Sequence, residues 1–435
     1  MGEKESILLV EPKFPIPTKS KNHKNFFPIG LLKIASYLKD IGKEVQIFRG
    51  IPDLKEEYRN LSKFNPSEIW ITSLFTYWAP YVRDTVQEYK KIFPDSKIIV
   101  GGVYASLFSK EEVMRYTGCD EVIQGVIPKA EEYLPNYELI KNGNSKEIDY
   151  QIIHTSRGCK RKCIFCGTWK IEPNFVSKKT IKDEILYKKL VFYDNNLLMN
   201  PYIEDILNEL VDLKKNKKIK WCESQSGFDG RLLIERPHLG KLLKKAGFRY
   251  PRIAWDGNYE DHPQIKKQLD ILIESGYSSK EIFVFVLYNW DIPFEEMERK
   301  RLKCWKWDVQ IADCRFRPLD QLFDYYNGRK REQTNKDYYI HEKVGWTDEL
   351  VKLFRRNIRE QNICVRYGFP LYSRAFETKS IGKEIRRQLK LLPTIDEKIR
   401  FLENRNIEYW IPDRPRNNTL HVKKETSNYA LCSPK

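Results

Sequence analysis

Residues 154–167 read HTSRGCKRKCIFCG and place three cysteines, Cys159, Cys163 and Cys166, within eight residues at the spacing C-x3-C-x2-C. The short, mostly apolar stretch 150–153 directly before them predicts a strand that leads into this loop. Thiolates are soft ligands, suited to iron–sulfur clusters or zinc. Three thiolates this close together can hold three irons of a 4Fe–4S cluster and leave the fourth iron free to bind a small molecule.

Two other interpretations of the cysteines are weaker. The chain has nine cysteines, an odd number, and its start does not read as a secretory signal, so a disulfide framework is not expected. A structural zinc site needs four ligands, usually supplied by two paired C-x2-C elements. The remaining cysteines form no second pair and are scattered singly, as Cys119, Cys222, Cys304, Cys314, Cys364 and Cys432.

The spacing, with Phe165 directly before the third cysteine, resembles the radical S-adenosylmethionine (SAM) superfamily. In that family the amino and carboxylate groups of SAM chelate the open iron. An electron from the cluster then cleaves SAM to a 5′-deoxyadenosyl radical, which takes hydrogen from a substrate. The resemblance implies that Cys159, Cys163 and Cys166 ligate the cluster and that the backbone at Phe165 meets the adenine edge. It also implies a partner that donates electrons, such as flavodoxin or ferredoxin.

The length and composition of the chain limit the classes of protein to which it can belong. With 435 residues, the chain is expected to form two or three domains, and 41% hydrophobic residues suffice for packed cores. The longest apolar runs, such as 282–288, are far too short to span a bilayer, so no membrane contact is expected. The charged start, MGEKE, is unlike a secretory signal. We therefore expect a cytoplasmic protein, a location that also suits an oxygen-sensitive cluster.

The chain is strongly basic, with a formal net charge of +17. Residues 330–435 alone hold 23 Lys and Arg against 14 Asp and Glu. Such a surface permits an anionic substrate or a nucleic-acid partner, although lysine-rich surfaces also simply keep proteins soluble. No residue set encodes a recognisable substrate pocket.

Short apolar runs alternate with helical patterns through the first 140 residues, which predicts a Rossmann-like, doubly wound parallel sheet. The predicted strands are 7–10, 45–48, 69–72, 97–100 and 122–123, and the predicted helices lie near 28–38 and 80–93. Ligands of such sheets bind at the carboxyl ends of the strands. Gly101 and Gly102 end the fourth strand, where backbone without side chains can approach a bulky ligand.

This domain, residues 1–140, resembles the cobalamin-binding domain that precedes many radical SAM cores. The matching pieces are FPIGLL at 27–32, IIVGG at 98–102 and DEVIQG at 120–125. The family often carries D-x-H-x-x-G after its first strand, whereas this chain has His23 within NHKN, typical of an exposed loop histidine. The resemblance leaves open whether cobalamin binds without a histidine ligand or the domain is a scaffold without cofactor.

The polar segment 136–149 predicts a linker, and the second domain is expected over residues 150–328. Further strands are predicted at 190–193, 220–226, 252–257, 282–288 and 308–313. With the strand before the cysteines they make six, as expected for the partial (β/α)6 TIM-type barrel of the radical SAM core. Such folds place their chemistry at the carboxyl ends of the strands.

Polar residues at those ends are candidates for SAM binding. The resemblance places Asp194 and Asn195 after the second strand, facing the SAM amino group. Gln225 ends the third strand, and Asp256 ends the fourth, where a carboxylate can bind ribose hydroxyls. The alternative to SAM binding is a structural role, in which each of these side chains caps a loop or a helix.

Several arginines and lysines near these candidates are open to plainer interpretations. Arg157, Arg161 and Lys162 flank the cysteines and are interpreted as solvated loop charges. Arg315 and Arg317, just past the last strand, are expected to close the barrel rim rather than to hold an anion.

Residues 329–435 predict a basic, mainly helical region. Thr347 is expected to cap a helix that runs to about Asn362, and a second helix is expected over 381–392. The polar face of the first helix carries Arg355, Arg356 and Arg359. This face is either a phosphate-binding surface or, more commonly, a solvated face over a core.

The resemblance therefore implies a radical SAM enzyme with a 4Fe–4S cluster and SAM as cofactors, and it leaves open whether cobalamin is a third. By resemblance, the leading reaction is methyl transfer from methylcobalamin to an unactivated carbon. An alternative enzyme performs a cobalamin-free rearrangement, coupling or oxidation, with the first domain as scaffold. A third hypothesis is a nucleic-acid-binding module with a structural metal, for which the basic C-terminal region is the support.

Overall fold

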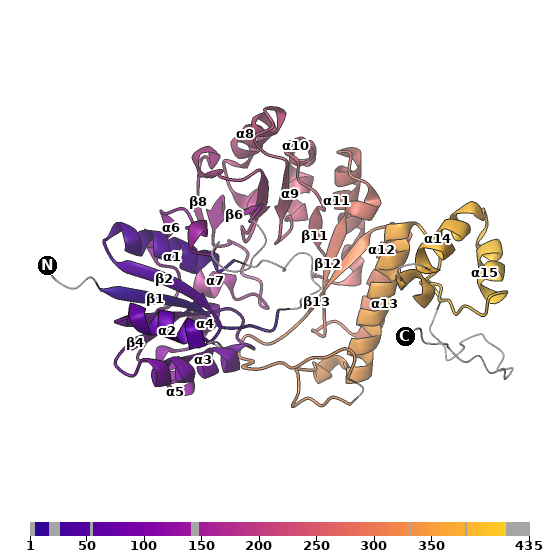
Figure 1. The fold of residues 1–435 in the computed structure, drawn as a ribbon. Coiled ribbons are helices and arrows are strands. Elements are labelled where there is room, and N and C mark those ends of the chain that lie inside the picture. Colours follow the sequence, from indigo (N-terminus) through magenta and orange to yellow (C-terminus); the bar gives the residue numbers. More distant parts are fainter. Residues whose placement is uncertain are drawn as a thin grey trace.

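A computed structural model describes residues 5–16, 27–52, 55–140, 148–330, 332–378 and 381–414. Figure 1 shows an N-terminal sheet in indigo, central strands and helices in magenta and pink, and C-terminal helices in orange and yellow. Within these ranges, no helix is both long and apolar enough to cross a membrane.

The N-terminal sheet is parallel and has the strand order β2-β1-β3-β4-β5. In this sheet Leu8 pairs with Ile69, and Ile69 with Ile98. All five strands lie where the apolar runs predicted them: β1 (Ser6–Glu11), β2 (Glu44–Arg49), β3 (Glu68–Ser73), β4 (Lys97–Gly102) and β5 (Glu121–Val122). Fully apolar runs suit this arrangement because helices cover both faces of the sheet.

Helices pack on both faces, as the doubly wound prediction requires. Helix α1 (Ile29–Asp40) begins directly after Pro28 and buries Leu31 against Ile7. On the other face, α3 (Ala79–Ile92) buries Val82 against Leu8. Burying a side chain of this size stabilises the fold by roughly 1.5–3 kcal/mol. The other helices of this part are α2 (Lys55–Phe64), α4 (Val103–Leu107), α5 (Lys110–Thr117) and α6 (Pro128–Glu131).

The central part contains the six predicted strands. They are β6 (Gln151–Ile153), β9 (Lys189–Phe192), β10 (Trp221–Ser224), β11 (Arg252–Ala254), β12 (Phe283–Tyr288) and β13 (Gln310–Arg315). These strands form two parallel three-stranded sheets, β10-β9-β6 and β11-β12-β13. A parallel bridge between Phe228 and Ile253 joins the segment after β10 to β11. The strands are confirmed, and their closure into a partial barrel stays a prediction.

Helices follow these strands and lie outside them (Figure 1). They are α8 (Ile203–Lys215), α9 (Gly230–Glu235), α10 (His238–Ala246), α11 (His262–Glu274) and α12 (Phe294–Lys306). One continuous core joins the helices to the strands, with Phe192, Leu207, Leu243 and Val284 fully buried. The antiparallel pair β7 (Ser156–Arg157) and β8 (Val176–Ser177) brackets the cysteine loop and the short α7 (Thr168–Ile171).

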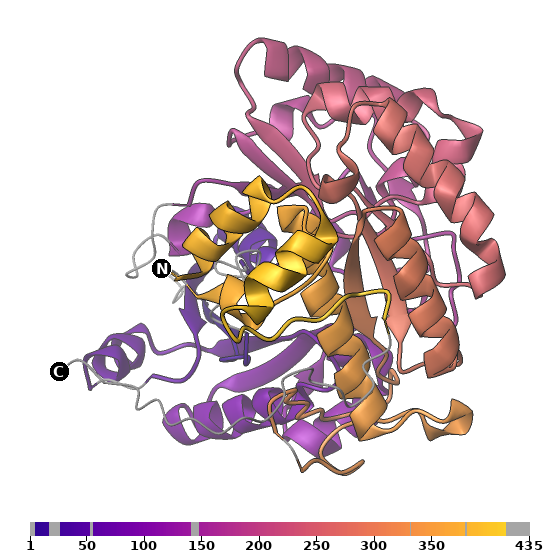
Figure 2. The same ribbon diagram turned by 90° about the vertical axis from the view of Figure 1, so that its right-hand side faces the viewer.

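The C-terminal region is helical, as predicted. Helix α13 (Asp348–Tyr367) packs against β13 and α12, and the Thr347 hydroxyl accepts a hydrogen bond from the backbone N–H of Leu350 (3.3 Å). The helix passes the predicted end and stops at Gly368, whose φ of +72° suits a left-handed cap. Figure 2 shows α14 (Ile381–Leu391) and α15 (Ile395–Glu403) beside α13. The sequence did not predict α15.

Seven short 3-10 helices connect these elements. They are η1 (Tyr137–Ile140), η2 (Lys182–Glu184), η3 (Leu197–Met199), η4 (Tyr259–Asp261), η5 (Ser279–Glu281), η6 (Glu342–Val344) and η7 (Arg374–Glu377), counted over the ranges given above. His23 and Cys432, named in the sequence analysis, lie outside the described residues.

The turn from β4 into α4 depends on Gly102, and replacing it with alanine tests this. Gly102 has φ +94°, and an added Cβ would lie 2.2 Å from the Ser73 carbonyl oxygen. We expect Gly102→Ala to lower the free energy of unfolding by roughly 3 kcal/mol, since strain and a backbone clash combine. Gly118→Ala is the control, because Gly118 has φ +81° and nothing within 4 Å. It should cost only about 1–2 kcal/mol. Urea unfolding measures the free energy of unfolding of both variants. Equal losses would contradict the predicted clash between the added Cβ at Gly102 and the Ser73 carbonyl oxygen.

Candidate functional site

The three cysteines lie on the loop between β7 and α7, beyond the carboxyl end of β6. All three are free thiols and are half-buried. The loop turns at Cys163, whose carbonyl accepts hydrogen bonds from the backbone N–H of Cys166 (3.1 Å) and the indole N–H of Trp169 (3.1 Å). The backbone N–H of Arg161 donates a hydrogen bond to Sγ of Cys159 (3.4 Å).

The three thiols are electrostatic neighbours. Burial raises the pKa of Cys163, and Cys166, Asp256 and Cys159 raise it further. Over the described ranges, no three His, Cys, Asp or Glu side chains converge where one metal ion could bind. A 4Fe–4S cluster makes a different demand, because each thiolate binds its own iron, and three half-exposed thiols on one loop fit it.

Asp194 lies fully buried just after β9, where its carboxylate is already engaged. Oδ1 accepts hydrogen bonds from the hydroxyls of Thr155 (2.6 Å) and Ser156 (2.8 Å) and from both of their backbone N–H groups. Burial raises the pKa of Asp194, and these hydrogen bonds act in the opposite direction. The side chain thus ties β9 to the strand end that leads into the cysteine loop. A direct contact from Asp194 to SAM stays a prediction.

Glu172, which the sequence did not single out, closes the other end of the cysteine loop. Its carboxylate accepts hydrogen bonds from Nη2 of Arg157 (2.6 Å), the backbone N–H of Gly158 (2.7 Å) and Nδ2 of Asn195 (3.1 Å). The structure therefore places the predicted SAM residue Asn195 against the loop. Glu172 follows the motif in a stretch without periodicity, so no sequence signal marks it.

The interpretation of the loop arginines as solvated charges is wrong for two of them. Arg157 pairs with Glu172, and Nε of Arg161 lies 3.0 Å from a carboxylate oxygen of Asp229. Carboxylates from segments distant in the sequence neutralise both, which no local pattern reveals. Lys162 is exposed, as expected.

Asp256 lies just after β11, on the same side as the cysteine loop. Burial raises its pKa, while Lys300 and Arg231 lower it, and both Asp256 and Arg231 are electrostatic neighbours of Cys163. Among the residues of the described ranges, none donates a hydrogen bond to this carboxylate. Asp256 therefore presents a half-buried carboxylate with its acceptor positions open.

The other two SAM candidates of the central part differ in placement. Phe165 packs edge-to-face on Trp290, with ring centroids 6.2 Å apart, so the cysteine loop meets the segment after β12. Gln225 instead donates from Nε2 to Glu223 (3.2 Å), and its backbone N–H donates to the carbonyl of Phe192 (3.0 Å). Within the described ranges Gln225 makes no hydrogen bond to the cysteine loop, and its role toward SAM stays a prediction.

The basic residues past β13 form ion pairs. The fully buried carboxylate of Asp324 pairs with Arg315 and with Nε of Arg317 (3.4 Å). A rim-closing role of these two arginines stays a prediction. On α13, Arg355 lies 3.9 Å from a carboxylate oxygen of Asp313 and Arg359 pairs with Glu377. Arg356, the third arginine predicted on this face, is exposed and has no ion pair within the described ranges.

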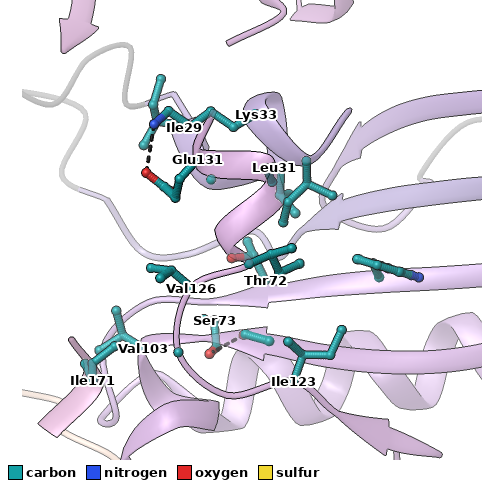
Figure 3. A pocket seen from close by; sticks show the side chains of 18 of the residues that line it. Ile29, Leu31, Lys33, Thr72, Ser73, Val103, Ile123, Val126, Glu131 and Ile171 are labelled. Atoms are coloured by element: carbon teal, nitrogen blue, oxygen red, sulfur yellow. Dashed lines mark hydrogen bonds and ion pairs between the residues drawn. The ribbon is translucent and has the colours of Figure 1, made fainter. Parts of the chain in front are cut away.

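A cavity of about 240 Å³ lies at the carboxyl edge of the N-terminal sheet. Its walls come from the start of α1, the ends of β3 and β4, and the segment after β5. Figure 3 shows the apolar side chains of Leu31, Ile123 and Val126 around it. The remaining wall is formed by residues that flank the cysteine loop, namely His154, Arg157, Ile171 and Glu172. The cavity therefore lies between the sheet and the cysteine loop.

Gly101 and Gly102 both line this cavity. Their backbone is held in place by Ser73, whose hydroxyl donates to the carbonyl of Gly101 (2.7 Å) and accepts from the backbone N–H of Ala105 (3.2 Å). The two glycines thus expose main chain without side chains, held in place by Ser73, to the cavity where a ligand was predicted to bind.

Charged side chains line one side of the cavity (Figure 3). Nζ of Lys33 lies 2.8 Å from Oε2 of Glu131, and Nη1 of Arg157 lies 3.9 Å from the same oxygen. Burial lowers the pKa of Lys33. Burial acts to raise the pKa of Glu131, but Arg157 and Lys33 together lower it below its usual value.

His154 lines the cavity with a largely buried imidazole. It is 7% exposed, and Nε2 lies 3.4 Å from Nη1 of Arg157. Since a guanidinium can only donate, this contact requires Nε2 without a proton. Burial first, and then Arg157 and Lys33, lower the pKa of His154 well below its usual value.

The comparisons with known proteins agree with the N-terminal resemblance. Residues 21–134 match the family model of the B12 binding domain. A solved cobalamin-binding protein from Desulfitobacterium hafniense DCB-2 is 20% identical, with 28% of this chain and 53% of that chain covered and a TM-score of 0.20. No curated protein matches this chain.

The cobalamin-dependent S-adenosylmethionine radical enzyme OxsB is also similar. Its apo structure is 14% identical, with 82% of this chain and 56% of that chain covered and a TM-score of 0.42. Its structure with aqua-cobalamin bound is 13% identical, with 72% and 54% covered and a TM-score of 0.46. This chain thus spans little more than half the length of these solved proteins.

The neutral state of His154 predicts a pH dependence of stability. Unfolding restores the ordinary pKa near 6.5, so the unfolded chain binds a proton that the folded chain does not once the pH falls below that value. Stability should fall with decreasing pH by up to about 1.4 kcal/mol per pH unit from this residue. We expect His154→Asn to lose less stability than the wild type between pH 7.5 and 5.5 in urea unfolding. Parallel losses in the two proteins would show that His154 is not the titrating group.

Proposed function

We propose that this chain is a radical SAM enzyme that holds a 4Fe–4S cluster on Cys159, Cys163 and Cys166 and binds cobalamin in the cavity beside them. One observation carries the proposal. The cavity is lined on one side by strand ends of a segment that matches the B12 binding domain, and on the other by residues that flank the cysteine motif. Two cofactors of linked chemistry would therefore be neighbours.

The chain supplies ligands and contacts for the cluster and SAM. When bound, the cluster supplies the electron that cleaves SAM. Asp256 is proposed to accept hydrogen bonds from the ribose hydroxyls, since no described residue occupies its carboxylate. Phe165 is proposed to meet adenine from the cysteine loop, held there by Trp290. Asp194, Asn195 and Gln225 are proposed to contact SAM directly.

The residues around the cavity fit cobalamin. The apolar slot suits a flat heterocycle, and the open backbone of Gly101 and Gly102 allows close approach. Beside the slot, the paired charges of Lys33 and Glu131 offer both donors and acceptors to amide side chains. When bound as methylcobalamin, the cofactor supplies a methyl group, so the proposed reaction is methyl transfer to an unactivated carbon.

A second enzyme function uses the same cysteines without cobalamin, with the N-terminal domain as scaffold. The glycine-walled cavity and the B12 binding match favour the first proposal over it. The nucleic-acid-binding module has less support, because Arg355 and Arg359 are ion-paired. We further propose that the enzyme is cytoplasmic and has three domains, 1–140, 150–328 and 329–435. Its proposed substrate is anionic, and its proposed electron donor is a flavodoxin or a ferredoxin.

Metal analysis tests the cluster. After anaerobic reconstitution with iron and sulfide, we expect about four irons and matching sulfide per chain. Cys159→Ala, Cys163→Ala and Cys166→Ala should each lose most of this iron and the reductive cleavage of SAM to 5′-deoxyadenosine. Cys119→Ala is the matched control, because Cys119 is a free thiol buried in the core of the N-terminal sheet, away from the cysteine loop and the cavity lining. Zinc near one per chain, or iron retained in all three variants, would contradict the proposal.

Retention of cobalamin tests the cavity. We expect the reconstituted protein to keep about one hydroxocobalamin per chain through desalting, as read from its absorption spectrum. Val126→Trp should abolish retention, because Val126 lines the cavity and a larger side chain would fill it. Val176→Trp should retain the cofactor, because Val176 is 62% exposed on β8 and does not line the cavity. A wild type that retains no cobalamin, with an intact cluster, would favour the cobalamin-free alternative.

A further inference from the structure

Glu172 belongs to the cysteine loop and to the cavity at the same time. Its carboxylate holds Gly158 and Arg157, the two residues directly before Cys159, and it also forms part of the cavity wall. Among the acidic residues of the described ranges, only Glu172 both accepts hydrogen bonds from these two residues and lines the cavity. Glu131 also lines the cavity, but it reaches Arg157 only as an ion pair at 3.9 Å.

Glu172 closes the loop that carries the cysteines. Gly158 has φ +77°, and an added Cβ would lie 2.4 Å from the carbonyl oxygen of Asn174, so the start of the loop packs directly on the segment after α7. Between these two ends Ile164 is 75% exposed and Lys162 is exposed, while Phe165 packs on Trp290 and Arg161 pairs with Asp229. The positions of the cysteines therefore depend on these two contacts together with the closure at Glu172 and the cap at Asp194.

Two sets of contacts connect the N-terminal domain to Glu172 and the end of the cysteine loop. An ion-pair series runs from Lys33 on α1 through Glu131 on α6 and Arg157 on β7 to Glu172, with links of 2.8, 3.9 and 2.6 Å. Independently, α4 contacts α7, and an added Cβ at Gly167 would lie 3.2 Å from the side chain of Leu107. Helix α4 begins directly after Gly102, which itself lines the cavity.

We propose that Glu172 is a positioning residue that couples the cavity to the cysteine loop, so that a cofactor in the cavity and a cluster on the loop bind interdependently. The inference rests on the proposed function for the identity of both cofactors. A group that fills the cavity meets Arg157 and Glu172 and orders them. The same two side chains then hold Gly158 and the first cysteine in the geometry that the cluster needs. Coupling of this kind is reciprocal, so the cluster strengthens binding in the cavity by the same factor.

The test is the dissociation constant of hydroxocobalamin, measured by absorption titration on cluster-free and cluster-reconstituted protein. In the wild type we expect the cluster to tighten binding about fivefold or more. Glu172→Gln should bring this ratio close to one, because an amide cannot accept hydrogen bonds from Arg157, Gly158 and Asn195 in the same way. Glu184→Gln is the control, since Glu184 pairs with Lys178 and does not line the cavity, and its ratio should equal that of the wild type.

A second variant keeps the test decisive if Glu172→Gln does not fold. Glu131→Gln weakens the ion-pair series from the other domain without touching the hydrogen bonds of Gly158, and it should also lower the ratio. A wild-type ratio near one with firm cobalamin binding, or wild-type ratios in both variants, would overturn the inference and leave the proposed function standing. No cobalamin binding by either form of the wild type would instead overturn the cobalamin part of the proposed function.

Discussion

The cysteine loop is too short and too exposed to bury a core, so its shape has to come from bonds at its two ends. At the start, the buried carboxylate of Asp194 accepts hydrogen bonds from Thr155 and Ser156. At the end, Glu172 holds Arg157 and Gly158. Both carboxylates are largely removed from water, where hydrogen bonds to a charged group contribute roughly 1.5–3 kcal/mol each. These bonds brace the two ends of the segment that carries the three half-buried thiols.

The second constraint is the meeting of two parallel sheets near their carboxyl ends. Backbone and side chains at such ends are free to face a ligand, because the strands stop there and the chain turns into loops. In this protein the ends of β3 and β4 face residues that follow β6, and the cavity lies between them. The ion pairs among Lys33, Glu131, Arg157 and Glu172 join the two sides. The site is thus an interface between two folds rather than a feature of one.

Much of the fold could be predicted because it follows local patterns. The apolar runs of the N-terminal sheet, the start of α1 after Pro28 and the Thr347 cap all depend on residues close in sequence. The six central strands were also found from their apolar runs. The sequence missed α15 and placed the end of α13 too early, because helix ends depend on weak capping signals such as Gly368.

The sequence by itself determined the parts of the site that a short motif carries: three thiols at cluster spacing, and the glycines at the end of β4. Only the tertiary structure decided which charged groups serve them. No sequence motif marks Glu172, Glu131 or Lys33. In the sequence Arg157 and Arg161 resemble ordinary loop charges, because the carboxylates that pair with them lie in other segments. The physical reason is that the Coulomb energy of a pair depends on distance and burial, and both are set by segments up to about a hundred residues apart in the chain.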